Sequence, residues 1–343
     1  MGQKKEVKLE DIAKALGISI VSVSNALKGK KGVSMELRQK VQKKADELGY
    51  RSPKAAAKRE TGSYCIGVMI AERYVKEFPS FYMDVYKQIA QSAAKKGSLV
   101  VLEIIDVEKE ELRQTSSYFT NMEVHGIIFL GEMNIEFIRD VKMNNEVPFV
   151  GIDFYDVNET MDYIVPDSFH GMMAVTQRII DAGHTDIAFL GNPRATKSIL
   201  DRYMGYCMAL ENNGIKEKAG RVIWDRKMGR QNYVIDFELP AKLPTAFVAN
   251  CDKSAYILID KLRKNGIRVP EDISVAGFDY SYPPASEELN LTTYESDGKA
   301  MAQIGINTLL KRIEKKNIQG EGAEGIRIVE GQIIEGNTIK KIS

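Results

Sequence analysis

The chain has 343 residues, 44% of them hydrophobic and 28% charged, with a formal net charge of +1. This length exceeds a single ordinary core, so we expect two or three domains. The apolar runs are far too short to span a membrane, and no apolar segment follows the lysines at the amino terminus, so we expect neither a membrane anchor nor a secretory signal. Three widely spaced cysteines, Cys65, Cys207 and Cys251, favour free thiols in a reducing cytoplasm over disulfides or a metal site.

The charge is unevenly distributed along the chain. Residues 1–61 hold 15 Lys and Arg against 7 Asp and Glu, whereas the rest holds 33 against 40. A basic head on an acidic body is typical of a nucleic-acid-binding module attached to a domain that does not touch nucleic acid.

Residues 9–28 predict two short helices joined by a tight turn. Apolar side chains recur at helical spacing in the first helix, at Leu9, Ile12, Ala13 and Leu16. Gly17 can end that helix, and Ser19 can cap the next by accepting from its free N–H groups. In the second helix we expect Val23, Ala26 and Leu27 to face inward, and Ile20, Val21, Ser22 and Asn25 to face outward. The pattern indicates a helix-turn-helix that binds DNA; the alternative is a generic helical hairpin.

A third helix is predicted to begin after Ser34, which can cap it, and to end at the glycine of position 49. Its apolar side chains are expected to close the small core: Leu37, Val41, Ala45 and Leu48. Pro53 can begin a further helix, but residues 54–59 have almost no apolar face. A helix this short and polar is marginal alone, so it needs a partner to order it.

From Tyr64 onward, strand-like and helical segments alternate. We expect strands at 64–70, 98–105, 126–130, 147–152, 186–191, 244–249 and 273–278. The helices are expected at about 80–96, 108–121, 134–144, 168–182, 199–213 and 252–265. Continuous apolar strands alternating with amphipathic helices predict parallel sheets covered on both faces, and the length suggests two such sheets. Ligands of such sheets bind at the carboxyl ends of the strands, here between two lobes.

The motifs of common enzyme classes are absent from the sequence, including GxGxxG after a strand, GxxxxGK[ST], GxSxG and HExxH. The histidines His125, His170 and His184 share no local ligand spacing, so we expect structural or surface roles for them. The sequence therefore predicts a protein that is not an enzyme and holds neither a cofactor nor a metal.

The motifs resemble those of the LacI/GalR family of bacterial transcription regulators over nearly the full length. The head carries DIAKALGIS, VSVSNALKG, GVSMELRQKV and ADELGY, followed by a proline. The body carries VHGIIFL, PFVGID, VPDSFHG, DAGHTDIAFLG, DRYMGYCMAL, PTAFV, IRVPEDISVAGFD and LTTYESD in the family's order and spacing.

This resemblance implies an all-α helix-turn-helix domain at 1–50, a hinge at 51–63, and a core at 64–343 that binds an effector and dimerises. The core is expected to have the type I periplasmic-binding-protein fold, with two Rossmann-like lobes built on parallel sheets. The expected lobes are about 64–165 plus 293–324, and about 166–292 plus 325–343, with crossovers near residues 166, 292 and 325.

By the same resemblance, the helix from about Ser19 to Leu27 lies in the major groove of DNA. Asn25 can pair with adenine, whereas Ile20 and Val21 can contact thymine methyl groups. Polar side chains beside them suit phosphates. The implied DNA contacts are Ile20, Val21, Ser22, Ser24, Asn25 and Lys28, with Ala55 and Ala56 in the hinge. One head offers too little surface for high specificity, so we expect a homodimer on a pseudo-palindromic operator.

The hinge departs from the family pattern, in which a leucine wedges into the minor groove. Residues 52–65 contain no leucine, and Lys58, Arg59 or Glu60 stands in its place. Because a leucine wedge kinks the duplex, we predict weaker operator bending for this chain.

The resemblance also implies an effector site between the lobes. Phe81 and Tyr82 match an aromatic pair, Arg202 a clamping arginine with fork-shaped donors, and Asp279 an accepting carboxylate. Trp224 is a candidate for stacking or for core packing. The implied ligand-binding residues are Phe81, Tyr82, Asp153, Arg202, Trp224, Cys251, Asp252 and Asp279.

The predicted function is that of a cytoplasmic repressor of transcription. We expect a sugar to change its operator affinity allosterically. A regulator responding to a purine or a phosphorylated sugar is an alternative effector class. A solute-binding receptor of a transporter would share the body fold but has no use for residues 1–61, and an enzyme lacks its motifs here.

Overall fold

A computed structural model describes residues 8–27, 34–48, 64–114, 124–227, 234–281, 289–315 and 324–342. The chain divides into two compact units, Met1–Tyr64 and Cys65–Ser343, called the head and the core below. The predicted hinge at 51–63 lies outside the described residues. Among the described residues, no helix has the length and apolar character needed to cross a membrane.

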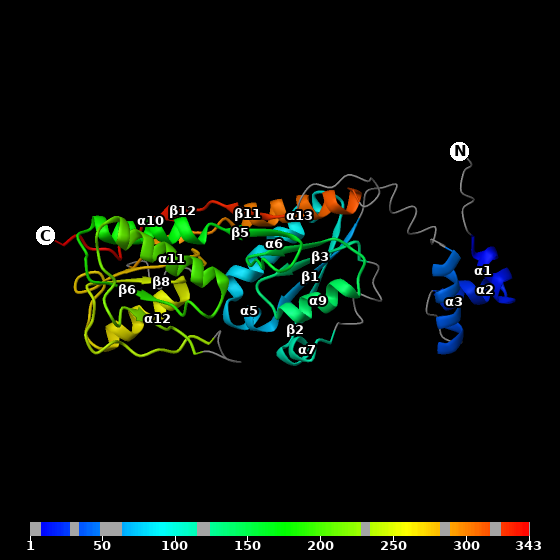
Figure 1. Ribbon diagram of the computed structural model, residues 1–343, viewed down its shortest axis with the longest axis horizontal. Helices are drawn as coiled ribbons and strands as arrows, with labels where there is room; N and C mark the ends of the chain where they lie inside the picture. Colours follow the sequence, from blue (N-terminus) through cyan, green and yellow to red (C-terminus); the bar gives the residue numbers. More distant parts are fainter. Residues whose placement is uncertain are drawn as a thin grey trace. The chain divides into compact units, whose positions relative to one another are not determined.

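The head contains three helices, α1 (Leu9–Leu16), α2 (Ile20–Leu27) and α3 (Met35–Leu48) (Figure 1). Each helix contributes buried side chains to one small core: Ile12, Ala13, Val23, Ala26, Val41 and Ala45. Because the buried positions recur at helical spacing on every helix, the predicted helix-turn-helix and third helix are confirmed.

The ends of the head helices follow the predicted chemistry. Gly17 adopts φ +63°, and its N–H donates to the Ala13 carbonyl, which ends α1 in a left-handed cap. The Ser19 hydroxyl accepts from the Ser22 N–H at 3.0 Å, and the Ser34 hydroxyl accepts from the Leu37 N–H at 3.2 Å. The expectation that Leu48 closes the core is wrong: it is 37% exposed, because it is the last residue of α3.

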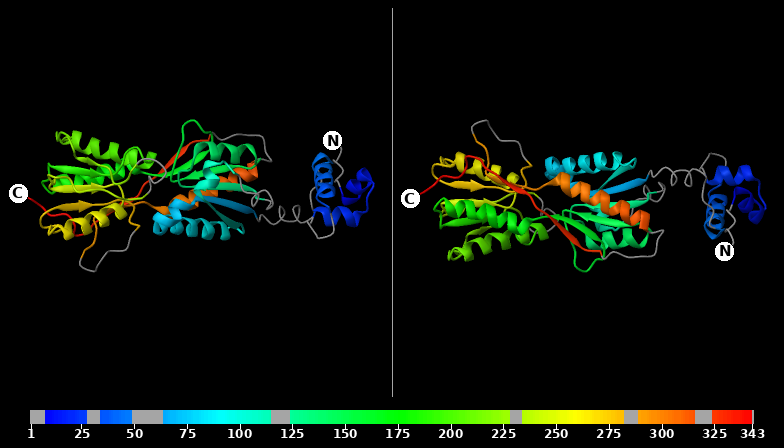
Figure 2. Two further views of the ribbon diagram at one scale, coloured as in Figure 1. Left: turned by 90° about the horizontal axis from the view of Figure 1, so that it is seen from below. Right: turned by 90° about the horizontal axis from the view of Figure 1, so that it is seen from above.

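The first lobe of the core has a six-stranded, all-parallel sheet. In spatial order its strands are β11 (Ile326–Val329), β5 (Asp162–Pro166), β4 (Phe149–Ile152), β3 (Gly126–Leu130), β1 (Cys65–Ala71) and β2 (Leu99–Ile105). Its helices are α5 (Glu72–Glu77), α6 (Pro79–Ala94), α7 (Val107–Glu111), α9 (Ile135–Met143) and α13 (Gly298–Lys315). α13 packs against α6 and the sheet, with α9 on the opposite side (Figures 1 and 2). Every residue of the central strands β1 and β3 is buried.

The second lobe has a four-stranded parallel sheet in the order β7 (Val222–Ile223), β6 (Ile187–Leu190), β8 (Ala246–Ala249) and β9 (Ser274–Ala276). Helices α10 (Ser168–Asp181) and α11 (Lys197–Asn212) contribute to one hydrophobic cluster, and α12 (Asp252–Lys264) contributes to another. Apolar side chains thus cover the sheet on both faces, and the predicted two-lobed parallel α/β architecture is confirmed.

The chain crosses between the lobes three times: after β5, between β10 (Thr293–Glu295) and α13, and between β11 and β12 (Gln332–Ile334), where β10 and β12 pair antiparallel. Two predicted lobe limits differ from these crossings. Thr293–Glu295 pairs with β12, and Ile326–Val329 pairs with β5 of the first lobe. The last two crossings therefore fall a few residues later than predicted.

Three helices differ from the prediction, and one of them is the short α5, which was not predicted at all. The helix expected at 108–121 is only α7, because the chain turns at Leu112 and Arg113 takes φ +54°; residues 115–121 lie outside the described range. α13 was not predicted, although its buried residues Met301, Ala302, Ile306 and Leu309 recur at helical spacing.

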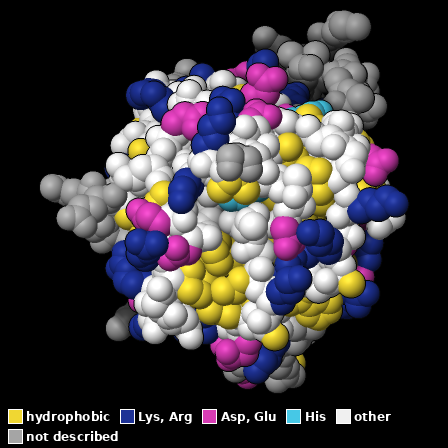
Figure 3. Space-filling model, turned by 90° about the vertical axis from the view of Figure 1, so that its left-hand side faces the viewer, with side chains coloured by type: hydrophobic (Ala, Val, Ile, Leu, Met, Phe, Trp, Pro, Cys, Tyr) yellow, Lys and Arg dark blue, Asp and Glu magenta, His cyan; other side chains and the backbone are white. Residues whose placement is uncertain are grey.

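Charge on the described surface of the core is mixed. On the face at the carboxyl-terminal end, Lys and Arg side chains are interspersed with Asp, Glu and apolar patches (Figure 3). This face lacks the excess of basic residues that marks the head sequence.

Candidate functional site

The second helix of the head presents its predicted outer face to solvent. Ile20 is 44% exposed and Val21 is 67% exposed, whereas Val23 and Ala26 are buried. Ser22, Ser24 and Asn25 are partly exposed. This face combines apolar and small polar side chains on a short helix, as a helix that reads base edges requires. Lys28, Ala55 and Ala56 lie outside the described residues.

The core has a cavity of about 60 Å³ between its lobes. The first lobe lines it with Tyr74, Phe78, Phe81, Tyr82 and Asp153. The second lobe lines it with Thr196, Ser198, Ile199, Arg202, Arg226, Asn250, Cys251, Lys253, Asp279 and Ser281. Several of these residues directly follow strands β4, β8 and β9, so the cavity lies where ligands of parallel sheets bind.

The Arg202 guanidinium on α11 donates hydrogen bonds to other residues of the core. Its Nη2 lies 2.9 Å from Oδ1 of Asp279, and its Nη1 donates to the Asn250 carbonyl at 2.6 Å and to Oδ2 of Asp279 at 3.3 Å. The guanidinium also stacks 4.0 Å from the centroid of the Phe278 ring. The structure therefore brings together the predicted clamp and the predicted acceptor as a buried, two-pronged ion pair.

Asp153 and Tyr82 form the polar part of the first-lobe wall. The Tyr82 hydroxyl donates to Oδ2 of Asp153 at 2.7 Å. Oδ1 of Asp153 is buried and has no hydrogen-bond partner among the described residues. Burial raises the pKa of the Asp153 carboxyl to about 7, although the Tyr82 hydrogen bond and Arg202 act in the opposite direction.

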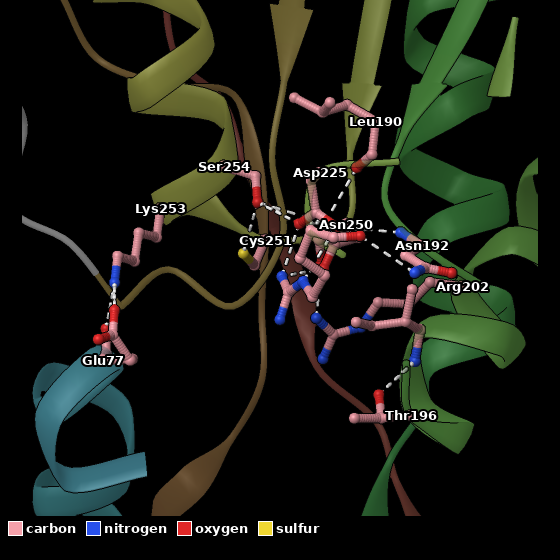
Figure 4. A network of polar contacts seen from close by, with 12 residues as sticks. Glu77, Leu190, Asn192, Thr196, Arg202, Asp225, Asn250, Cys251, Lys253 and Ser254 are labelled. Atoms are coloured by element: carbon pink, nitrogen blue, oxygen red, sulfur yellow. Dashed lines mark hydrogen bonds and ion pairs between the residues drawn. The ribbon is translucent and has the colours of Figure 1, made fainter. Parts of the chain in front are cut away.

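A buried polar network supports the second-lobe wall (Figure 4). Arg226 pairs with both oxygens of Asp225, at 3.0 and 2.6 Å. Asn250 and Ser254 each donate to Oδ2 of Asp225 at 2.7 Å. Burial opposes ionisation of Asp225, but Arg226 and these donors hold its pKa below the usual value. The Cys251 thiol lies beside this network, 3.3 Å from the Ser254 hydroxyl, and burial raises its pKa.

Arg226 and Asn250 line the cavity but were not among the predicted site residues. Contacts between segments that are distant in the sequence position both side chains. Arg226 donates to the Asn250 amide oxygen, and Asn250 donates to the Leu190 carbonyl. The adjacent Asp225–Arg226 pair carries no sequence signal that separates it from a surface ion pair. Asn250 follows a strand, which is the one signal that could have identified it.

Two predicted site residues do not line this cavity. Asp252 is buried elsewhere: its carboxylate accepts from the Thr293 hydroxyl at 2.6 Å and from the Ser281 N–H at 3.1 Å. The Trp224 ring is 43% exposed and lies beside the Arg194 guanidinium. Asp252 therefore joins α12 to β10, and Trp224 lies on the surface.

Polar contacts join the lobes around the cavity. Lys253 on α12 lies 2.8 Å from Glu77 at the end of α5 (Figure 4). Lys197 lies 2.8 Å from Asp156, and its N–H donates to Glu132 at 3.2 Å. These contacts hold the lobes close together, which explains the small volume of the cavity.

A larger cavity of about 690 Å³ adjoins the first beside the crossings. The two share Phe81, Asp279 and Ser281. The other lining residues are Ser80, Asp84, Val85, Tyr280, Glu295, Ser296, Asp297, Gly298, Lys299, Glu330, Gly331 and Gln332. Its volume falls in the range of small-molecule sites, about 300–1,000 Å³.

A helix-turn-helix head followed by a two-lobed core with a cavity between its lobes defines the class of ligand-responsive DNA-binding proteins. Residues 8–52 match the family model "Bacterial regulatory proteins, lacI family", and residues 176–338 match that of the "Periplasmic binding protein-like domain". The chain therefore joins a lacI-family helix-turn-helix domain to a periplasmic-binding-protein-like domain, and it is a DNA-binding transcriptional regulator.

Its relatives span the whole chain. It is 26% identical to the HTH-type transcriptional repressor PurR of Vibrio campbellii, over 98% of this chain and 99% of the relative. The structure matches that of the transcriptional regulator CelR in complex with cellobiose with a TM-score of 0.67, at 21% identity over 97% of this chain and 100% of the other. It matches the lac repressor dimer bound to operator and the anti-inducer ONPF with a TM-score of 0.65, at 22% identity over 98% and 100%.

Proposed function

We propose that this chain represses transcription as a homodimer on a pseudo-palindromic operator, in the bacterial cytoplasm, and that a sugar bound between the lobes changes its operator affinity. The observation that carries the effector class is the pairing of the Phe81 and Tyr82 rings with hydrogen-bonding side chains around one cavity. Flat apolar rings with a few placed polar groups suit a ring of hydroxyls. The cellobiose complex of the structurally similar CelR supports this class.

The exposed face of α2 is the proposed reader of the operator. Asn25 pairs with an adenine, while Ile20 and Val21 contact thymine methyl groups. The hydroxyls of Ser22 and Ser24 bind phosphates, with Lys28 beside them and with Ala55 and Ala56 of the hinge against the DNA. Two such heads on two half-sites give the specificity that one lacks, in line with the lac repressor dimer on its operator.

The proposed switch is a change in the angle between the lobes. The 60 Å³ cavity is below the size of ordinary ligand sites, so the lobes lie close together around it, beside the larger cavity of about 690 Å³. Bound sugar favours a wider arrangement, which requires the Lys253–Glu77 and Lys197–Asp156 contacts to change. The shift in operator affinity cannot exceed the sugar's differential affinity for the two arrangements.

A thermal-shift screen of the full chain tests the effector class. A ligand that binds only the folded state raises the melting temperature, and we expect neutral or charged sugars to do so. Phe81→Ala should reduce the shift, whereas Trp224→Phe, outside both cavities, should leave it unchanged. A melt that responds to nucleobases and to no sugar would refute the sugar proposal.

The lacI-family head argues against the alternative of a transporter's solute receptor, which needs no DNA-binding helix. Gel shifts with operator fragments selected from random sequence test this directly. Retarded complexes whose amount changes with the stabilising sugar are expected. If the head enriches no particular DNA sequence from the random pool, the result would contradict the regulatory function.

A further inference from the structure

One carboxyl oxygen in the wall of the 60 Å³ cavity lacks a donor. Asp153 is more than nine-tenths buried, and within the described parts of the chain its Oδ1 has no hydrogen-bond partner, while Oδ2 accepts from Tyr82. A buried acceptor without a donor destabilises the folded state relative to a satisfied one, so a ligand that donates to it gains affinity. Asp153 holds this position with φ +66°, a conformation that aspartate adopts more readily than most residues.

The cations of the same wall are already neutralised. Arg202 is paired with Asp279, Arg226 with Asp225, and Lys253 with Glu77. Among the described residues, binding a phosphate or a carboxylate to one of these cations would disrupt an existing ion pair, and the pairs of Arg202 and Arg226 are buried. Asp153 is therefore the unmatched charge of the lining, and its sign is negative.

The lining of the adjoining 690 Å³ cavity also has an excess of negative charge. Besides the paired Asp279, it is lined by four carboxylates and one lysine: Asp84, Glu295, Asp297, Glu330 and Lys299. Of the four, Asp84 lies 4.0 Å from the Lys87 ammonium, an exposed contact. Glu295 accepts from Gln332, and Asp297 accepts from the Ala300 N–H, so neither of these two is neutralised by these contacts. A cavity lined by an excess of one charge raises the local concentration of the opposite charge.

We propose that the effector is a cationic hydroxylated molecule, such as an amino sugar, whose ammonium group donates to Oδ1 of Asp153. This inference rests on the proposed sugar-responsive function and specifies the charge of the ligand. Acidic and phosphorylated sugars are disfavoured, because the described cations of the smaller cavity are paired and Lys299 of the larger cavity is outnumbered by four carboxylates in the same lining. Pairing with an ammonium also favours the ionised form of Asp153, so binding near neutral pH releases protons.

The test compares sugars that differ only in charge. Binding of glucose, glucosamine and glucose 6-phosphate to the full chain is measured by calorimetry at about pH 6.5, where the amine is protonated. A charge-assisted hydrogen bond is stronger than a neutral one, so we expect glucosamine to bind about tenfold more tightly than glucose. Glucose 6-phosphate should bind most weakly. Galactose and galactosamine provide a second pair if the gluco configuration does not fit.

Asp153→Asn removes the charge and keeps the shape, and asparagine tolerates positive φ. It should abolish the preference for the amino sugar. Asp252→Asn is the matched control, since Asp252 is equally buried with its pKa also raised to about 7 by burial, but it lies outside both cavities and should keep the preference. Should the Asp153 variant not fold, heats of the wild type in phosphate and Tris buffers still report the released protons.

The outcomes separate this inference from the proposed function. Equal binding of glucose and glucosamine, or a preference that survives in Asp153→Asn, overturns the cationic effector and leaves a sugar-responsive regulator. Suppose that a polyamine such as spermidine binds in an Asp153-dependent manner and no sugar binds. This result would refute a sugar effector and would support a cationic one. Tighter binding of glucose 6-phosphate than of glucose overturns the charge argument.

Discussion

Replacing Arg202 with methionine tests the buried ion pair at the centre of the cleft. Methionine keeps an apolar contact with the Phe278 ring but removes donors to Asp279, to the Asn250 carbonyl and, at 3.4 Å, to the Ser168 hydroxyl. Of its described side-chain donors, the Asp279 carboxylate would retain the Ser296 hydroxyl, also at 3.4 Å. Removing one partner of a buried pair costs about 3–5 kcal/mol, because the other charge stays buried and uncompensated.

Urea unfolding of the full chain, followed by tryptophan fluorescence, measures this loss. The single tryptophan, Trp224, lies in the second lobe with Arg202, so its signal reports unfolding of that lobe. The double variant Arg202→Met/Asp279→Asn removes both charges and should recover about 1–3 kcal/mol relative to the sum of the single variants. A single variant that costs less than about 1 kcal/mol, with no coupling to Asp279, would refute the assignment of a buried, mutually dependent pair.

Three further predictions concern the operator, the hinge and pH. Asn25→Ala should relax preference at one base pair of each half-site and cost about 1–3 kcal/mol, as measured by footprinting against an operator library; an unchanged footprint would remove Asn25 from the reader. Circular-permutation gel shifts should show less bending than a relative with a leucine hinge, and equal bending would contradict the role given to the leucine-free hinge. Because burial raises the Asp252 pKa from 3.8 to about 7, the folded state holds a proton that the unfolded chain loses; its contribution is full below about pH 4, and stability should fall as pH rises to 7. Asp252→Asn should flatten that part of the profile in denaturation curves.

Much of the architecture follows from local patterns. β1 and β3 are short apolar runs bounded by turn residues, and they are buried throughout. The head helices have one apolar stripe each, with Gly17 and Ser34 at the expected boundaries. α13 was missed although its periodicity is as clear, whereas the helix expected at 108–121 failed because backbone geometry at Arg113 ends it.

The cleft was predictable in location but not in its internal pairing. Arg202 and Asp279 were each expected to face the ligand, and both line the cavity, but they bind each other across 77 positions of sequence. Asp153 and Asp252 were equally plausible ligand residues. One has an unsatisfied oxygen in the cavity wall, and the other joins α12 to Thr293.

The sequence by itself determined the classes of structure: a basic helix-turn-helix of the lacI family and a two-lobed parallel α/β core like that of periplasmic binding proteins. These depend on periodicity, capping and strand ends, which act over a few residues. Only the tertiary structure decided which charges are neutralised, since the adjacent Asp225 and Arg226 meet Asn250 from a segment about 25 residues further along the chain. Whether a charge is neutralised depends on distances of a few ångströms between such segments. In this site, those distances leave Oδ1 of Asp153 without a hydrogen-bond partner among the described residues.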